Sequence, residues 1–557
     1  MKNKYNITIQ GITASFIIMV FLLMNGCTKL DETTYSSVQM NQFYKNRRDV
    51  LEAVLRPYTH MQAWMAPTGQ NGYYYNSELA ADQLAWPQKG VNGYDGGDHI
   101  RLHYHTWTAD ENRMLDCWKL IWTGIGFVNS ALEDVSQLDT AAVGMSQREL
   151  TGAVSELHVL RAFHYMKAMD LWGNVPVATT VPKGGQIENP STKPRDSIFA
   201  FVQSELEQYV PTLLPYSNDL IGRVSQAAGY AMLAELYLNA EKWIGKPMWD
   251  QCIAACDKII SGQAGGINGG PKLSPNLDAC FGNLNSLSPE PLFQVAFSRK
   301  GGFTFDWSGF FSGYDYMEPA LGIDFSGWNA FVVIPSAFNA YAENDLRKKD
   351  WFLFGPQYNL ATNEPILGSF EYKGKPIVFV NSIRKESQGD HTSEGSMTEG
   401  EENSGARFNK YKPGYSMDIP AKGLKKDDNY RENQYILYRL TEIYFDKAEA
   451  LMRKNGGKAT QEAVDLINAS RKRAFKEADW AKAQFNVSNF TLDSLLAERG
   501  REFIFEGKRR EDLIRFGRFT TATWWDHKPT NDHNRELFAI PNVQLGANPN
   551  LKQNPGY

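Results

Sequence analysis

Cysteine is scarce in this sequence, with five residues in 557. So few cysteines exclude a fold that is held together by disulfides. Beyond residue 27 no apolar run approaches the roughly 18–20 residues that a membrane-spanning helix requires, which excludes a multi-span membrane protein. Positive charge is not in excess either, since Lys and Arg total 58 against 63 Asp and Glu. This mildly acidic balance argues against nucleic acid as a partner.

Motifs of common catalytic sites are also missing. The chain has no GxSxG nucleophile elbow, no phosphate-binding loop and no GxGxxG dinucleotide fingerprint. Its 42% hydrophobic and 22% charged residues are ordinary for a globular protein. We therefore expect a folded chain, and none of these motifs predicts a cofactor.

The N-terminus has the pattern of a targeting segment. Lys2 and Lys4 precede an apolar stretch from Ile12 to Met24, which is too short to span a membrane. The stretch ends in Leu-Met-Asn-Gly-Cys, and a small residue before Cys27 resembles a bacterial lipoprotein cleavage box. We expect residues 1–26 to be a lipoprotein signal peptide and Cys27 to carry the acyl chains that anchor the protein. An ordinary signal peptide with an incidental cysteine is the alternative.

Helical periodicity dominates the remaining chain and predicts a mainly α fold. Successive amphipathic segments read as antiparallel helix pairs, with Ala227, Ala231 and Ala448 at positions of close approach. Such repeated pairs are typical of a tetratricopeptide-like stack. The segments that predict helices are residues 48–64, 111–135, 157–172, 195–209, 225–240, 249–260, 435–454, 460–474 and 492–505.

A long insertion interrupts this helical pattern. Residues 262–430 are rich in Gly, Pro, Asn and aromatics, with few short strand-like runs such as Ile377 to Val380. Residues 387–404 read as a polar surface loop. The predicted organisation is thus a helical region at 27–261, an irregular loop-rich insertion at 262–430, and returning helices at 431–557.

Several motifs, in one order along the chain, carry a family resemblance. Glu498 to Leu513 reads ERGREFIFEGKRREDL, and the chain ends in NPNLKQNPGY. Earlier matches are LRA at 160–162, LWGNVP at 171–176, RLTEIY at 439–444 with KAEA at 447–450, and Ile467-Asn468 with Arg471 and Arg473-Ala474. Together these motifs resemble the SusD/RagB family, and the start of the mature chain at Cys27 fits it.

The resemblance implies a fold and a function. Members are outer-membrane lipoproteins in which tetratricopeptide helix pairs are wrapped by an irregular loop-rich region. They sit as a lid on a SusC-like TonB-dependent transporter, bind oligosaccharides or less often peptides, and are not enzymes. The resemblance thus implies three partners, namely an oligosaccharide, that transporter and the outer membrane. It also implies that the charged motif at 498–512 is structural.

Aromatic side chains in loops are the candidate ligand contacts, because a flat ring suits the apolar face of a sugar. One concentration lies within residues 73–122 and a second within residues 307–328, between glycines. By their position in the family's pattern, Trp86, Trp307 and Trp328 match three ligand-contacting aromatics. Neighbouring candidates are Tyr75, Tyr94 and Tyr314, and the polar candidates for sugar hydroxyls are Asp82, Gln83, Asn92, Asp98, Arg101 and Asn329.

Other interpretations stay open at this stage. His99, His103 and His105 form a local cluster that suits zinc, and Asp95 with Asp98 suits a structural calcium ion. A glycoside hydrolase with two facing carboxylates is the rival from another class, although the helical pattern lacks the usual barrel strands. A pure protein scaffold is a third interpretation. The remaining cysteines, including the close pair Cys252 and Cys256, read as buried free thiols.

Overall fold

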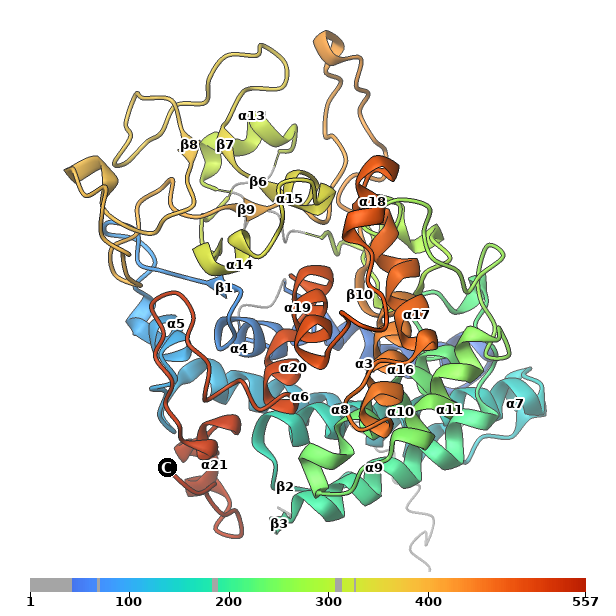
Figure 1. Ribbon diagram of the computed structural model, residues 1–557. Coiled ribbons are helices and arrows are strands. Elements are labelled where there is room, and N and C mark those ends of the chain that lie inside the picture. The colour runs from blue at the N-terminus through green and yellow to red at the C-terminus, as the bar shows by residue number, and fades with distance from the viewer. Residues whose placement is uncertain (1–42, 68–70, 183–188, 306–312, 325–326) are drawn as a thin grey trace, which may run out of the picture.

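The computed structural model describes residues 43–557, except 68–70, 183–188, 306–312 and 325–326. A layer of helices forms the lower part of the molecule in Figure 1, and the loop-rich insertion lies above it. Strands are short and occur in two-stranded sheets. The prediction of a mainly α fold is confirmed. Within the described ranges, none of the helices combines the length and apolar character needed to cross a membrane.

The helices pack as one continuous array in which each contacts the next. Buried alanines let them approach closely, because Ala227, Ala231 and Ala448 are completely covered by neighbouring helices. This arrangement confirms the predicted stack of antiparallel pairs. In order, the array comprises α3 (Arg47–Met61), α6 (Asn112–Val135), α8 (Gln147–Trp172), α9 (Arg195–Tyr209), α10 (Gln226–Ile244), α11 (Trp249–Ile260), α16 (Leu440–Lys454) and α17 (Gln461–Arg471).

Local signals in the sequence set the ends of these helices. The side chain of Ser146 accepts from the backbone N–H of Glu149, and the Glu149 carboxylate accepts from the N–H of Ser146, so α8 begins at a capping box. Gly173 ends α8 with a positive φ of 67°. Asn174 and Pro176 follow, so the Trp-Gly-Asn-Val-Pro run of the family motif is a helix stop.

The insertion separates, along the sequence, two helices that contact each other in the structure. α11 ends at Ile260 and α16 begins at Leu440, yet the two pack side by side as if they were consecutive. Periodicity predicts that this helix begins at Tyr435, but α16 begins at Leu440. Residues Tyr435–Arg439 form strand β10, which pairs with β4 (Pro291–Val295) and is buried along its whole length. The run YILYR is rich in β-forming residues, and pairing with a distant strand overrides the helical pattern.

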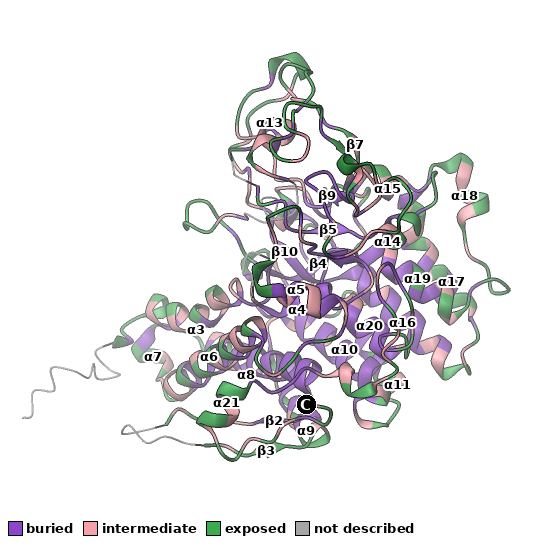
Figure 2. Ribbon diagram, turned by 90° about the vertical axis from the view of Figure 1, so that its left-hand side faces the viewer, coloured by how far each residue is buried: buried purple, intermediate pink, exposed green. Residues whose placement is uncertain are grey.

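Besides β4 and β10, one small sheet fastens the insertion to the helical region, because β1 (Leu84–Ala85) pairs with β5 (Val332–Val333). Two further sheets lie within the insertion, where β6 (Phe352–Leu353) pairs with β9 (Arg407–Phe408) and β7 (Gly355–Pro356) with β8 (Val378–Phe379). Short helices α14 (Pro335–Asn339) and α15 (Leu346–Asp350) lie between them. Figure 2 shows exposed chain around β7 and the nearby helix α13 (Glu318–Leu321), and buried chain where the insertion meets the helices.

The interpretation of residues 387–404 as a surface loop is wrong for its last four residues. Glu401, Glu402, Asn403 and Ser404 are all at most 2% exposed. A polar run looks solvated in sequence, but here the carboxylates receive hydrogen bonds from distant backbone groups and are drawn inside. Cys117, Cys252, Cys256 and Cys280 are buried and free, as predicted.

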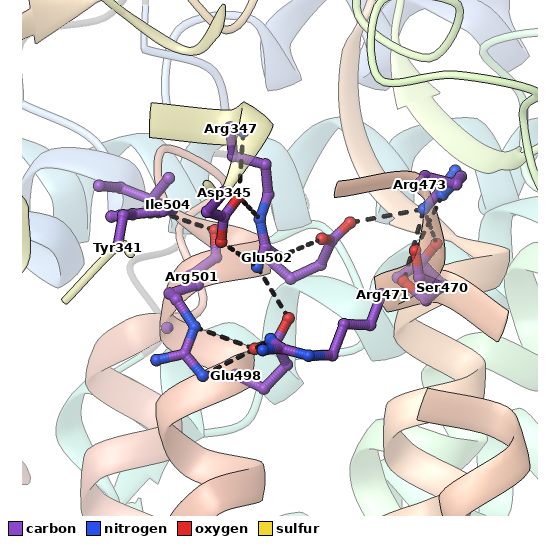
Figure 3. A network of polar contacts seen from close by, with 12 residues as sticks. Tyr341, Asp345, Arg347, Ser470, Arg471, Arg473, Glu498, Arg501, Glu502 and Ile504 are labelled. Atoms are coloured by element: carbon purple, nitrogen blue, oxygen red, sulfur yellow. Dashed lines mark hydrogen bonds and ion pairs between the residues drawn. The ribbon is translucent and has the colours of Figure 1, made fainter. Parts of the chain in front are cut away.

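Buried ion pairs join the insertion to helix α19 (Leu492–Phe503) and confirm the structural role of the charged motif. Figure 3 shows the guanidinium of Arg347, in α15, between the carboxylates of Asp345, Glu498 and Glu502, at 2.8, 2.9 and 2.9 Å. Burial alone would raise the pKa of Glu498, but the surrounding arginine charges lower it to about 2. Glu498 is therefore ionised inside the protein, and its ion pair with Arg347 holds the two regions together.

His164 gives the helical layer a dependence on pH. Its ring is fully buried in α8, Nδ1 donates to the carbonyl of Leu160 at 2.8 Å, and burial lowers the pKa from 6.5 to about 4. The unfolded chain takes up this proton near pH 6.5 and the folded chain only near pH 4. Its stabilising contribution is therefore complete above pH 6.5 and is lost as pH falls, by up to about 3 kcal/mol at pH 4.

His164→Gln is expected to flatten the fall in stability between pH 6.5 and pH 4. Urea unfolding across this range measures the effect as a change of slope, which separates it from any uniform loss of stability caused by the substitution. His533→Gln is the control, because that ring is 73% exposed. An unchanged slope in His164→Gln would contradict the assignment.

Candidate functional site

Three aromatic side chains of the insertion gather on one exposed face and are called the aromatic platform here: Tyr314, Trp328 and Phe370. Tyr314 and Trp328 are opposite each other in an antiparallel bridge, so their side chains project to the same side. The rings of Tyr314 and Phe370 lie 4.6 Å apart at 45°. Trp328 is 52% exposed and Phe370 44% exposed. The platform thus presents large apolar faces to solvent next to polar loops.

The loop after β1 reaches the edge of this platform. Lys89 and Asn92 close a tight turn through two backbone hydrogen bonds of 2.8 and 2.9 Å. The Asn92 side chain hydrogen-bonds the phenol of Tyr314, and Tyr94, two residues on, is 52% exposed. Partial burial raises the pKa of Tyr314, although hydrogen bonds from Asn329 and Asn92 oppose the shift. Tyr94, Tyr314 and Trp328 are thus predicted site residues on accessible surface.

Asn329 lies beneath the platform rather than on it. The side chain is 2% exposed, and the backbone has a positive φ of 52°, which asparagine tolerates better than most residues. Its Nδ2 donates to the carbonyl of Glu402 at 3.1 Å, and its Oδ1 accepts from Nε of Arg407 at 3.1 Å. In this conformation Asn329 shapes the turn that carries Trp328.

Glu402 is a site residue that sequence reasoning missed. Its fully buried carboxylate accepts from the backbone N–H groups of Ser369, Phe370 and Tyr372, at 3.0, 3.1 and 2.6 Å. The hydroxyl of Tyr316 adds a fourth hydrogen bond at 2.7 Å. This one carboxylate therefore holds the turn that presents Phe370. Nothing in the polar run around it distinguishes Glu402 from its neighbours.

Trp86 and Tyr75 are buried, contrary to what direct ligand contact requires. Trp86 is 5% exposed, and His99 stacks on its ring at 3.9 Å and 7°. Tyr75 is completely buried, and its hydroxyl donates to the carbonyl of Pro67 at 3.0 Å. The reason is that β1 pairs with β5 and carries the chain into the core just before Trp86. In this conformation neither ring can be reached by a ligand.

The predicted charged contacts are largely occupied by other protein groups. Arg101 donates to Asp98 at 2.7 Å and to both carboxylate oxygens of Glu111. Asp82 receives a two-pronged hydrogen bond from Arg509, at 2.6 and 2.9 Å. Of the three predicted charged residues, Arg101 is the most accessible, at 34% side-chain exposure against 21% for Asp82 and 14% for Asp98. These groups can shape the loop more readily than they can bind sugar hydroxyls.

The histidine cluster does not converge on a common point. His103 Nε2 lies 3.1 Å from the carbonyl of Trp525, His105 Nε2 lies 2.8 Å from that of Ala80, and His99 stacks on Trp86. Across the described parts of the chain, no group of three or more His, Cys, Asp or Glu side chains is placed to hold a metal ion. Trp307 and Cys27 lie outside the described residues.

The fold defines a class of protein in which a tetratricopeptide-like stack supports an irregular, loop-rich region. Two family models match the sequence. One, described as the SusD family, matches residues 289–557, and the other, described as starch-binding and associating with the outer membrane, matches residues 30–238. The chain belongs to the SusD/RagB family.

Similar proteins extend over nearly the whole chain. The starch-binding protein SusD of Bacteroides thetaiotaomicron is 24% identical over 88% of this chain and 86% of its own length. SusD-like protein P2 of Formosa agariphila is 23% identical over the full length of both. Among solved structures, a laminarin-binding SusD-like protein has a TM-score of 0.67 at 19% identity and covers 92% of this chain and 100% of its own.

A further solved structure was determined with a ligand. Surface glycan-binding protein A from Bacteroides thetaiotaomicron, in complex with laminarihexaose, has a TM-score of 0.66 at 19% identity. It covers 91% of this chain and 99% of its own length. At this level of identity the likeness establishes the shared fold.

Proposed function

We propose that this protein is a cell-surface glycan-binding lipoprotein that captures oligosaccharides on the aromatic platform. The observation that carries the proposal is the exposed, rigidly held cluster of Tyr314, Trp328 and Phe370, with Tyr94 and Asn92 at its edge. Aromatic faces stack on the apolar faces of sugar rings, and the surrounding amides and hydroxyls suit sugar hydroxyls. The glycan ligands named for starch-binding SusD and for the laminarin-binding structure support this choice.

In this proposal the protein binds but does not hydrolyse its ligand. Cys27 carries the lipid anchor at the outer membrane, and the captured oligosaccharide passes to a SusC-like TonB-dependent transporter. The family description of association with the outer membrane supports the location. Each stacked ring contributes about 1 kcal/mol, so several contacts must act together to reach micromolar affinity, about −8 kcal/mol.

The test is an affinity-gel screen of residues 28–557 against polysaccharides, followed by calorimetry on any that bind. Trp328→Ala is expected to weaken binding about fivefold, which corresponds to about 1 kcal/mol, because the most exposed ring of the platform is lost. Phe43→Ala is the matched control, since Phe43 is equally exposed but lies beside α3 in the helical layer. Retention of peptides alone, or release of sugars during incubation, would overturn the proposal.

A further inference from the structure

Lys89 and Arg407 are two buried cations that lack an acidic partner. Lys89 is 3% exposed and Arg407 is completely buried, yet neither forms an ion pair with a carboxylate of the described residues. Arg347 and Arg439, equally buried, each bind several carboxylates. Burying a charge without an ion-paired carboxylate is costly: burial and the charge of Arg407 lower the pKa of Lys89 well below its ordinary value, and the charge of Glu371 opposes this shift only in part. We expect the free-energy cost of burying these two cations to be offset by a gain elsewhere in the protein.

The hydrogen bonds of both cations converge on the residue after Trp328. Lys89 Nζ donates to the carbonyls of Asn329 and Ala330, at 2.5 and 2.8 Å. Arg407 Nε donates to the side-chain oxygen of Asn329 at 3.1 Å. The other Arg407 nitrogens donate to the carbonyls of Glu402, Ser404 and Gly405. Asn329 is therefore fixed through its backbone and its side chain at the same time.

These contacts link segments that are far apart in the sequence. Lys89 belongs to the turn that carries Asn92 and Tyr94, whereas Asn329 follows Trp328 in the insertion. Lys89 thus sets the spacing between the two edges of the site. Arg407, in β9, ties the same point to the segment of Glu402, whose carboxylate holds the turn of Phe370.

We propose that Lys89 and Arg407 are positioning residues of the glycan site, which hold the Trp328 turn against the Tyr94 loop in one arrangement. The inference rests on the proposed function. A binding surface built from loops loses affinity when its rings must be ordered at the moment of binding, so preorganisation raises affinity. A fixed spacing between Tyr94 and Trp328 also selects glycan chains of matching curvature.

A role in fold stability alone predicts a different outcome. Lys89→Met removes the cost of burying an unpaired charge, but it also leaves the carbonyls of Asn329 and Ala330 without their donor, so the two effects on stability oppose each other. Lys89→Met should therefore change the urea midpoint little while it weakens glycan binding about five- to twentyfold through the loss of preorganisation. Lys89→Arg keeps donors to both carbonyls and is expected to restore most of the affinity. Lys373→Met, on an exposed lysine, is the matched control.

A double-mutant cycle with Trp328→Ala shows whether Lys89 acts through that ring. In the Trp328→Ala background, Lys89→Met is expected to change affinity by less than about twofold, since coupled residues are not additive. The fluorescence anisotropy of Trp328, obtained by difference from Trp328→Ala, is expected to fall in Lys89→Met. This second readout requires no ligand, so it tests the positioning role even if the protein binds no glycan. Unchanged affinity and anisotropy, or additive losses accompanied by a lower urea midpoint, would overturn the inference.

Discussion

Replacing Arg439 by methionine is expected to destabilise the protein by about 3–5 kcal/mol, because it strands buried carboxylates. The guanidinium is 1% exposed and binds Glu290 at 2.9 Å, Glu502 at 3.0 Å and Glu506 at 2.8 Å. Glu290 directly precedes β4, Glu502 lies in α19 and Glu506 lies in the turn after α19, so Arg439 ties separate parts of the chain together. Without it the carboxylates must take up protons or draw water into the core.

Urea unfolding followed by tryptophan fluorescence measures this loss. Arg48→Met is the control, because its ion pair with Glu52 is exposed on α3 and such exposed pairs contribute little to stability. Arg439→Lys is expected to recover little stability, since an ammonium cannot reproduce the planar, multi-pronged geometry of the guanidinium. A midpoint for Arg439→Met equal to that of Arg48→Met would show that the network is dispensable.

Replacing Glu402 by alanine is expected to release the turn that presents Phe370. Three backbone N–H groups and one phenol lose their charged acceptor, and a buried donor left without a partner costs about 1–3 kcal/mol. The loss of these four hydrogen bonds costs more free energy than the remaining contacts of a short turn provide. Residues 368–372 should therefore open locally while the helical layer stays folded. Glycan binding is then expected to weaken through the loss of Phe370 from the platform.

Hydrogen exchange of residues 368–372, read by mass spectrometry, checks this prediction. Glu402→Ala should raise exchange there by at least about tenfold, since 1.4 kcal/mol corresponds to a factor of ten. Glu394→Ala, on an exposed glutamate of the same polar run, is the control and should change nothing. Uniform deprotection of the whole chain in Glu402→Ala would mean that the carboxylate supports the global fold instead.

Much of the helical layer could be predicted from the sequence because its determinants are local. α9 and α11 begin and end where their periodicity and flanking residues place them, and α8 ends at Gly173. The five residues before α16 could not be assigned in this way. Their conformation depends on β4, which lies far away along the chain, and no local pattern reports such a pairing.

The site residues likewise fall into those that the sequence predicts and those that it cannot predict. A loop rich in aromatics near glycines identified Tyr94, Tyr314 and Trp328, which are all accessible. The same composition equally suggested Trp86 and Tyr75, because sequence does not show which side of a loop faces the core. Glu402 and Lys89 could not be predicted from the sequence, because their roles arise only when the fold brings distant carbonyls and N–H groups to them.

Because α11 and α16 pack directly together, the length of the insertion between them has little effect on the free energy of folding. About 180 residues separate two helices that pack directly together. The entropy lost on closing such a loop grows only with the logarithm of its length, so doubling it costs about 0.6 kcal/mol. Segments that carry the binding surface can therefore lengthen, shorten or be exchanged with little penalty to the helices beneath. One helical scaffold can in this way support many different recognition surfaces.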